Sequence, residues 1–319
     1  MLTSRPAATM ALSALAALLL ATGCGSAAGS RNQAGAGSTT ATPASTSASP
    51  ASTSASPSSS APTSPTSTPA SSAARSSTAA PRLSAAQLAA KLTGLFGTGG
   101  SYSVAALDLT TGRSSQAGAH GGMVLASLVK LDILETLLYQ RQRSGQPLTA
   151  GQEDDVEAMI EHSDNAAADR LFRLIGQHQG MARYNAVLDL HDTVLDTEGL
   201  WGLSTTSAND QLQLLQALVS PGSPLTAASR KHALDLLGDV EADQRWGVGA
   251  AGDRGSAALN KNGWLGVDDD QGRWAVNSGG VVRIGGHQVL MVVLSQHQPD
   301  FSTGVSRVER AAGLLAATL

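Results

Sequence analysis

Between residues 25 and 82 the sequence consists almost entirely of alanine, serine, threonine, proline and glycine, and this tract limits where a fold can form. Within it, the heptad Ala-Ser-Thr-Ser-Ala-Ser-Pro occurs twice, at 44–50 and 51–57. A segment of this composition has almost nothing to bury, so it cannot offset the entropy lost when its backbone is ordered. We therefore expect a disordered linker over 25–82 and a folded domain over 83–319.

The first 24 residues indicate export from the cytoplasm. Arg5 precedes an apolar stretch over roughly 7–21, which is shorter than the about 20 residues that a membrane span needs. The stretch ends in Leu20-Ala21-Thr22-Gly23-Cys24, which resembles a bacterial lipoprotein signal in which the cysteine is lipidated. We expect 1–24 to be a lipoprotein signal peptide and Cys24 to anchor the protein to the outer face of the cytoplasmic membrane. An ordinary signal peptide with an unrelated cysteine is the alternative.

Cysteine content and charge exclude several classes of protein. Cys24 is the only cysteine, which excludes an internal disulfide and a cysteine-based zinc site. Four of the 21 basic residues precede Leu83, whereas none of the 25 acidic residues do, so the folded part carries a net charge of −8. An acidic domain repels a phosphate backbone, which argues against nucleic acid as a partner. The seven histidines show no metal-ligand spacing, so we expect no metal.

The folded part mixes helical and strand patterns, which predicts an α and β fold. Only 3% of the chain is aromatic, so the core must be built from leucine, valine, isoleucine and alanine. Apolar residues recur with helical or alternating spacing in many segments. We expect helices over 83–96, from Ser127 toward Tyr139, and over 152–161, 166–174, 210–218 and 303–319, and strands over 101–109, 113–119, 273–284 and 287–296.

A serine and a lysine lie three positions apart in Ala126-Ser127-Leu128-Val129-Lys130, at the front of an apolar run. On a helix, positions i and i+3 share one face, so the hydroxyl and the amine are side by side. The helix dipole at an N-terminus favours developing negative charge. The pair therefore predicts an activated nucleophile, although a helix cap followed by a solvated lysine explains the same spacing.

Two further motifs follow in the chain. Ser163-Asp164-Asn165 directly precedes the expected helix 166–174, and Lys261-Asn262-Gly263 lies at the end of a predicted strand. Each has an ordinary structural explanation, because S-D-N is a good helix N-cap and Asn-Gly is a good turn. Neither motif alone indicates a function. They become informative because they follow Ser127 and Lys130 in this order.

The ordered set S-x-x-K, S-D-N and a K-T-G-like triplet resembles the penicillin-recognising serine hydrolases, and class A β-lactamases and related β-lactamase-like enzymes above all. The resemblance covers roughly 83–319. It implies an α/β (α+β) fold of the β-lactamase/transpeptidase type, in which helices flank an antiparallel sheet beside an all-helical lobe at about 131–250. It implies no cofactor, and we expect a monomer.

The same resemblance assigns roles to individual residues. It implies that Ser127 attacks a carbonyl, that Lys130 takes its proton, and that Ser163 relays a proton to the leaving nitrogen. Substrate-binding roles fall on residues of the second and third motifs: Asn165 for the substrate amide, Lys261 for a substrate carboxylate, with Asn262, Gly263 and Trp264 beside it. The backbone N–H groups of Ser127 and Trp264 are expected to form an oxyanion hole.

Two positions depart from the family pattern. Asn262 stands where the family has threonine or serine, whose hydroxyl contacts the substrate carboxylate; an amide can still donate a hydrogen bond there. The family's E-x-x-L-N, which carries the glutamate that activates the deacylating water, is absent. Glu198, in the loop over 190–202, is the candidate for that base, and a surface loop charge is the alternative.

These residues favour a serine hydrolase that acts through an acyl-enzyme, with β-lactam hydrolysis as the expected activity. A penicillin-binding protein or D-Ala-D-Ala peptidase with slow deacylation is the alternative if Glu198 is not the base. A non-catalytic cell-wall-binding lipoprotein is a third possibility, although the complete set of Ser127, Lys130, Ser163 and Asn165 argues against it. The expected partners are a β-lactam or a peptidoglycan stem peptide, and the membrane through Cys24.

Overall fold

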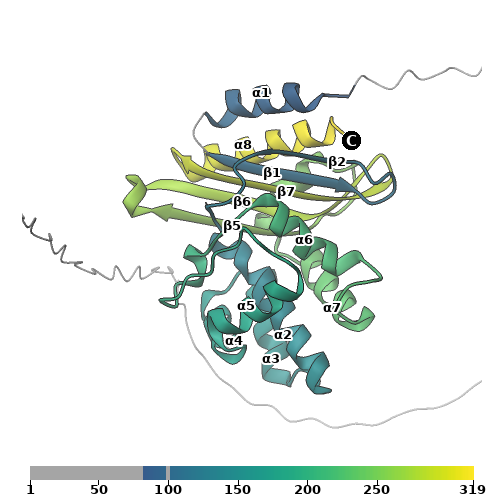
Figure 1. The fold of residues 1–319 in the computed structure, drawn as a ribbon, viewed down its shortest axis with the longest axis vertical. Coiled ribbons are helices and arrows are strands. Elements are labelled where there is room, and N and C mark those ends of the chain that lie inside the picture. Colours follow the sequence, from purple (N-terminus) through teal and green to yellow (C-terminus); the bar gives the residue numbers. More distant parts are fainter. Residues whose placement is uncertain (1–81, 98–100) are drawn as a thin grey trace, which may run out of the picture. The chain divides into compact units, whose positions relative to one another are not determined.

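The computed structural model describes residues 82–97 and 101–319. The predicted signal peptide, Cys24 and all but the last residue of the predicted linker lie outside the described residues. The described chain forms an antiparallel sheet with two helices on one face and a group of helices on the other (Figure 1). Among the helices that can be described, none is long and apolar enough to cross a membrane.

The main elements follow in the order helix, two-stranded hairpin, helical segment, three antiparallel strands, helix. The helices are α1 (Ala85–Phe96), α2 (Lys130–Ser144), α3 (Ala150–Glu161), α4 (Asn165–Leu174), α5 (Gln177–Val187), α6 (Ala208–Val219), α7 (Ala227–Gly238) and α8 (Phe301–Ala316). The strands are β1 (Tyr102–Asp108), β2 (Ser114–Gly118), β3 (Met123–Val124), β4 (Thr205–Thr206), β5 (Leu259–Val267), β6 (Arg273–Ile284) and β7 (His287–Gln298). Short 3₁₀ turns are η1 (Ala126–Val129), η2 (Trp201–Leu203), η3 (Ala242–Gln244), η4 (Val248–Ala251) and η5 (Asp268–Asp270).

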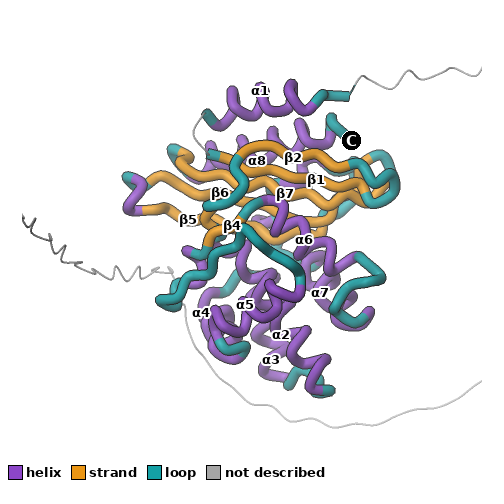
Figure 2. The backbone as a smooth tube through the Cα atoms, viewed as in Figure 1, coloured by secondary structure: helices purple, strands orange, loops and turns teal. Residues whose placement is uncertain are grey.

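Five strands form the main sheet in the order β2-β1-β7-β6-β5, and every neighbouring pair is antiparallel. Gly285 and Gly286 join β6 to β7 with φ angles of 57° and 82°. A two-residue type I′ hairpin loop requires positive φ at both of its residues. Strand β5 is an edge strand (Figure 2). It contacts the η1 turn that leads into α2, while α6 packs on the face of the sheet formed by β1 and β7. The helical lobe therefore meets the sheet both at this edge and on one face.

Strand β7 separates two hydrophobic cores because successive side chains point to opposite faces. All six residues over 289–294 are at most 1% exposed. The core shared with the helical lobe takes alternate residues of this run: Leu290, Val292 and Leu294. The core beneath α1 and α8 takes the others: Val289, Met291 and Val293. The apolar run that the sequence shows at this strand is thus a strand buried on both faces.

Most predicted elements are present with small shifts at their ends. The helix expected over 83–96 is α1, and its start at Ala85 is set by a capping box in which Ser84 and Gln87 exchange hydrogen bonds. Helix α2 ends at Gly145, which adopts a left-handed conformation with φ 67°. The sequence patterns single out neither α5 nor α7, because part of each buried face is small or polar, as at Gly180 and Ala233.

Helix α2 buries two carboxyl groups in the helical lobe. Asp132 and Glu135 are both 0% exposed. Asp132 accepts hydrogen bonds from Asn185 at 2.9 Å and Thr136 at 3.2 Å, and Glu135 accepts one from the Tyr184 hydroxyl at 2.8 Å. Burial raises the pKa of Asp132 to about 7 and raises the pKa of Glu135 well above its ordinary value. The folded protein therefore holds protons on these groups that the unfolded chain releases.

The raised pKa of Asp132 predicts that the free energy of unfolding falls as pH rises from about 4 to 7, because only the unfolded chain deprotonates in that interval. Replacing this carboxyl by an amide in Asp132→Asn should raise the free energy of unfolding at pH 8 by about 4 kcal/mol. At pH 4 the gain should largely vanish. Urea unfolding at both pH values measures this, and equal effects at the two would contradict it.

Candidate active site

Ser127 lies in the η1 turn, three residues before the start of the long helix α2. The residue before it, Ala126, has φ 48°, a left-handed conformation that costs a non-glycine residue about 1 kcal/mol or more. On β5, Gly263 packs directly against this turn: a Cβ there would lie 2.5 Å from the Leu128 nitrogen and 3.0 Å from the Ser127 nitrogen. Backbone contact with the edge strand therefore holds the serine turn in place, and only glycine permits it.

The amine of Lys130 connects Ser127 to the second motif. Lys130 is 0% exposed, and its Nζ lies 3.0 Å from Ser127 Oγ. The same Nζ lies 3.1 Å from Ser163 Oγ, 2.5 Å from the Ser163 carbonyl oxygen and 2.7 Å from Asn165 Oδ1. Asp164 positions these partners, because its carboxylate accepts a hydrogen bond from the Ala167 N–H and caps α4.

Lys261 brings the third motif to the same point. It is 0% exposed, and its Nζ lies 3.0 Å from Ser163 Oγ and 3.0 Å from the Asn262 carbonyl oxygen. Ser163 has φ 55°, so it too is in the left-handed region. Two buried amines, one from each lobe, thus meet at one serine hydroxyl.

Burial weakens the hold of both amines on their protons. Burial lowers the pKa of Lys130 to about 8, while the nearby carboxylates of Asp164 and Asp169 act in the opposite direction. Burial, followed by repulsion from Lys130, lowers the pKa of Lys261 well below its ordinary value. An amine without its proton has a lone pair that can accept the Ser127 hydroxyl proton. The site therefore contains a nucleophile with a base at hydrogen-bond distance.

Trp201, which the sequence analysis did not single out, also belongs to this site. Lys130 Nζ lies 5.2 Å from the centre of the Trp201 ring, and the indole N–H donates to Asp169 Oδ1 at 2.8 Å. Asp169 follows Asn165 by four positions on α4, so the two share a face of that helix. The sequence feature that could have indicated Trp201 is the presence of a tryptophan in a loop of a chain with few aromatic residues.

Glu198, the predicted deacylating base, lies in the same loop but makes no comparable contact. Its side chain is exposed, and its backbone N–H donates to Asp196 Oδ1 at 3.0 Å. Among the described residues, none forms a hydrogen bond or an ion pair with the Glu198 carboxylate. The catalytic role of Glu198 stays a prediction.

The Asn262 amide, which is predicted to bind substrate, lies apart from the two lysines. Asn262 is 1% exposed, and its amide donates to the carbonyl oxygens of Gln244 at 2.7 Å and Trp246 at 3.1 Å. Because side chains alternate along a strand, Asn262 lies on the face of β5 opposite Lys261. The Trp264 ring packs edge-on against Trp246, with centroids 5.9 Å apart, which leaves only the backbone of Trp264 for the predicted oxyanion hole.

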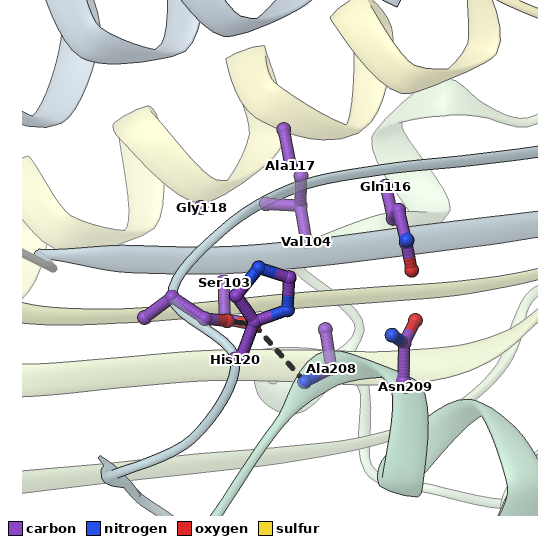
Figure 3. Close-up of a pocket in the computed structure, with 9 residues that line it drawn as sticks. Ser103, Val104, Gln116, Ala117, Gly118, His120, Ala208 and Asn209 are labelled. Atoms are coloured by element: carbon purple, nitrogen blue, oxygen red, sulfur yellow. Dashed lines mark hydrogen bonds between the residues drawn. The ribbon is translucent and has the colours of Figure 1, made fainter.

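The candidate site is identified by the side chains that converge on Ser163. Two cavities found elsewhere in the described structure are lined by none of the motif residues. One, of about 200 Å³, lies between β1, β2 and the start of α6, where the Ala208 N–H donates to Ser103 Oγ (Figure 3). The other, of about 490 Å³, lies between α1 and α8. Within the described residues, no group of three or more His, Cys, Asp or Glu side chains is placed to hold a metal ion.

The described chain has an antiparallel sheet with an attached helical lobe. Between them, Lys130 and Lys261 both contact Ser163, and Lys130 also contacts Ser127. This arrangement defines the β-lactamase/transpeptidase-like class. The model of a family described as the Beta-lactamase enzyme family matches residues 140–318. The chain belongs to this family. The matched segment contains Ser163, Asn165 and Lys261 and begins after Ser127 and Lys130.

Solved structures share the fold of this chain, and curated relatives match part of its sequence. The fold is similar to PBP-A (TM-score 0.61, 17% identity, covering 74% of this chain and 97% of that one). It is similar to the TLA-1 extended spectrum β-lactamase (TM-score 0.63, 14% identity, covering 72% and 97%). Putative lipoprotein LppW of Mycobacterium tuberculosis and Mycobacterium bovis is 28% identical over 133 residues, 41% of this chain and 42% of the relative. The chain thus spans about two fifths of the length of the curated relatives it matches.

The contact between Gly263 and the serine turn predicts a cost for adding one methyl group. In Gly263→Ala, the Cβ would meet the Leu128 nitrogen at 2.5 Å and the Leu125 carbonyl oxygen at 2.7 Å, both backbone atoms. We expect a loss of about 1–3 kcal/mol in the free energy of unfolding, because β5 must move away from the turn. Chemical unfolding measures it. Gly266→Ala, on the same strand but with only ordinary contact at 3.6 Å, is the control, and equal losses would contradict the prediction.

Proposed function

We propose that this protein is a serine hydrolase of the β-lactamase type in which Ser127 is acylated by the carbonyl of a β-lactam or a related amide. The observation that supports this best is the position of Lys130 Nζ, 3.0 Å from Ser127 Oγ, with the second amine, Lys261, 3.0 Å from Ser163 Oγ. A buried serine–lysine contact of this kind supplies a nucleophile and its base without any bound cofactor.

In the proposed acylation, Ser127 Oγ forms a bond to the substrate carbonyl carbon while its proton passes to Lys130 Nζ. Backbone N–H groups of Ser127 and Trp264 stabilise the negative oxygen that develops. The carbon–nitrogen bond then breaks, and the leaving nitrogen takes the hydroxyl proton of Ser163. Because the Ser163 oxygen lies near both amines, a proton from Lys130 restores it. The product is an ester on Ser127, with all atoms and protons accounted for.

Substrate recognition is proposed from the remaining groups around the serine. The Asn165 amide uses its oxygen on Lys130, which leaves its nitrogen to donate a hydrogen bond to a substrate carbonyl. Lys261, when protonated, supplies positive potential for a substrate carboxylate. Asn262 has no part in this proposal, because its amide nitrogen is already used on two backbone carbonyls.

Labelled penicillin tests the acylation step directly. Intact mass spectrometry should show one covalent adduct, and peptide mapping should place it on Ser127. Ser127→Ala should abolish the adduct, whereas Ser144→Ala, which changes a serine at the far end of α2, should leave it unchanged. If the unmodified protein forms no adduct and does not hydrolyse a chromogenic cephalosporin, the enzymatic proposal is wrong and the cell-wall-binding alternative remains.

The fate of the acyl group separates two candidate activities. Hydrolysis as a β-lactamase requires a base for the incoming water, and Glu198 is the residue predicted for it. The slow-deacylation candidate is a penicillin-binding protein or D-Ala-D-Ala peptidase. One observation favours it: the loop contacts Lys130 through the Trp201 ring, while the exposed Glu198 carboxylate forms no hydrogen bond or ion pair with the described residues. We therefore propose slow deacylation, in preference to the β-lactam hydrolysis expected from the sequence.

Glu198→Gln tests this choice, because the amide cannot accept a proton from water. With slow deacylation that does not use Glu198, the lifetime of the Ser127 adduct should be the same in Glu198→Gln and in the unmodified protein. Mass spectrometry over time measures the adduct. A short-lived adduct that becomes stable in Glu198→Gln would show that Glu198 is the base. That result would favour β-lactamase activity over slow deacylation.

We also propose that the domain acts outside the cytoplasmic membrane, held there through lipidated Cys24. The support is the sequence Leu20-Ala21-Thr22-Gly23-Cys24 together with the 28% identity to putative lipoprotein LppW. At that place the partner would be a peptidoglycan stem peptide or an incoming β-lactam.

A further inference from the structure

The loop between α5 and β4 meets the candidate site through one side chain. Antiparallel hydrogen bonds between Val194 and Thr205, at 2.8 and 2.9 Å, close the base of this loop. Its apolar residues Leu200 and Leu203 are 57% and 42% exposed. Trp201, between them, is instead half-buried, with its indole N–H bonded to Asp169 and its ring beside Lys130. The loop therefore covers the indole in part while its apolar neighbours remain in solvent.

The surroundings of Lys130 are otherwise polar or charged. Three residues lie within hydrogen-bond distance of its Nζ: Ser127, Ser163 and Asn165. The charged residues that affect it are Lys261 from β5, which shares the Ser163 hydroxyl with it, and Asp164 and Asp169 from α4. The face of the Trp201 ring is the one aromatic surface found near this amine in the described structure. Trp201 is thus placed to decide how much water reaches Lys130.

We propose that Trp201, held by its hydrogen bond to Asp169, is a positioning residue that shields the Lys130 amine from water and so keeps it available to accept the Ser127 proton. This inference rests on the proposed function, in which Lys130 is the base. Trp201 itself takes no part in bond making, and Asp169 acts only by holding the indole.

Two effects of the indole oppose each other, and their sizes determine the sign. A ring face near an ammonium group stabilises the charged form, which raises the pKa by about half a unit at an exposed site. Exclusion of water disfavours the charged form, by up to about 3–5 pKa units for a fully buried group. For Lys130, burial is the leading influence on the pKa and it lowers it. Removing the ring should therefore raise the pKa of Lys130.

Nuclear magnetic resonance of the lysine Cε carbons measures this without requiring catalysis. The chain contains four lysines, at 91, 130, 231 and 261, so a selectively labelled sample gives few signals, and Lys130→Met assigns the one of interest. In Trp201→Ala, the midpoint of the Lys130 titration should rise by about one pH unit. Trp201→Phe, which keeps a ring but cannot donate to Asp169, should give a smaller rise.

Two further variants sharpen the test. Asp169→Asn keeps an oxygen that can accept the indole N–H but removes a negative charge that favours the ammonium form, so the Lys130 midpoint should move down. Leu200→Ala removes apolar surface from the same loop without touching the amine, and the midpoint should stay unchanged. Thermal unfolding of each variant identifies any that fail to fold; Trp201→Phe, which keeps a ring, then provides the measurement.

The outcomes separate this inference from the proposed function. An unchanged or lowered Lys130 midpoint in Trp201→Ala, or an equal rise in Leu200→Ala, would overturn the shielding role even if Ser127 is acylated normally. If the midpoint rises as expected but penicillin never acylates Ser127, the shielding stands and the proposed function fails. Where acylation occurs, its rate as a function of pH should show the same shift as the lysine titration.

Discussion

Two buried lysines that share one serine hydroxyl join the lobes of this protein. Lys130 comes from α2 and Lys261 from the sheet, and the Ser163 oxygen lies 3.1 and 3.0 Å from their amines. Two fully charged amines in this place would repel each other and would each lose hydration. The fold therefore favours a state in which at least one amine is neutral, and the proposed activation of Ser127 requires that this amine be Lys130. The backbone conformations of Ala126 and Ser163, both at positive φ, are held by the same packing.

The edge strand β5 serves two purposes because its faces differ. Lys261 and Gly263 face the serine turn and the helical lobe, whereas Asn262 and Trp264 pack on the segment around Trp246. A one-residue change of register would exchange these faces and remove the amine from the site. The nine residue pairs between β5 and β6 hold that register. Positioning of the site thus depends on sheet pairing as much as on the motif itself.

The two halves of the proposed reaction are supported to different degrees by the fold. The groups for acylation are linked by hydrogen bonds, and its two amines, Lys130 on α2 and Lys261 on β5, are buried on regular elements. The region that would govern deacylation is a loop whose contact with the site is an indole, with Glu198 exposed beside it. Rigid elements hold catalytic groups more firmly than loops do, so variation in the fate of the acyl group is expected to arise in this loop.

The sequence alone determined what depends on local spacing. Ser127 and Lys130 share a face because they are three residues apart, Asp164 caps α4, and the alternating and apolar runs locate the strands. The order of three short motifs also pointed to the family. Only the tertiary structure decided that Asn262 turns away from the site and that Trp201 reaches Lys130, and it alone revealed α5 and α7. Those outcomes depend on packing between residues far apart in the chain, and a local pattern carries no information about such distances.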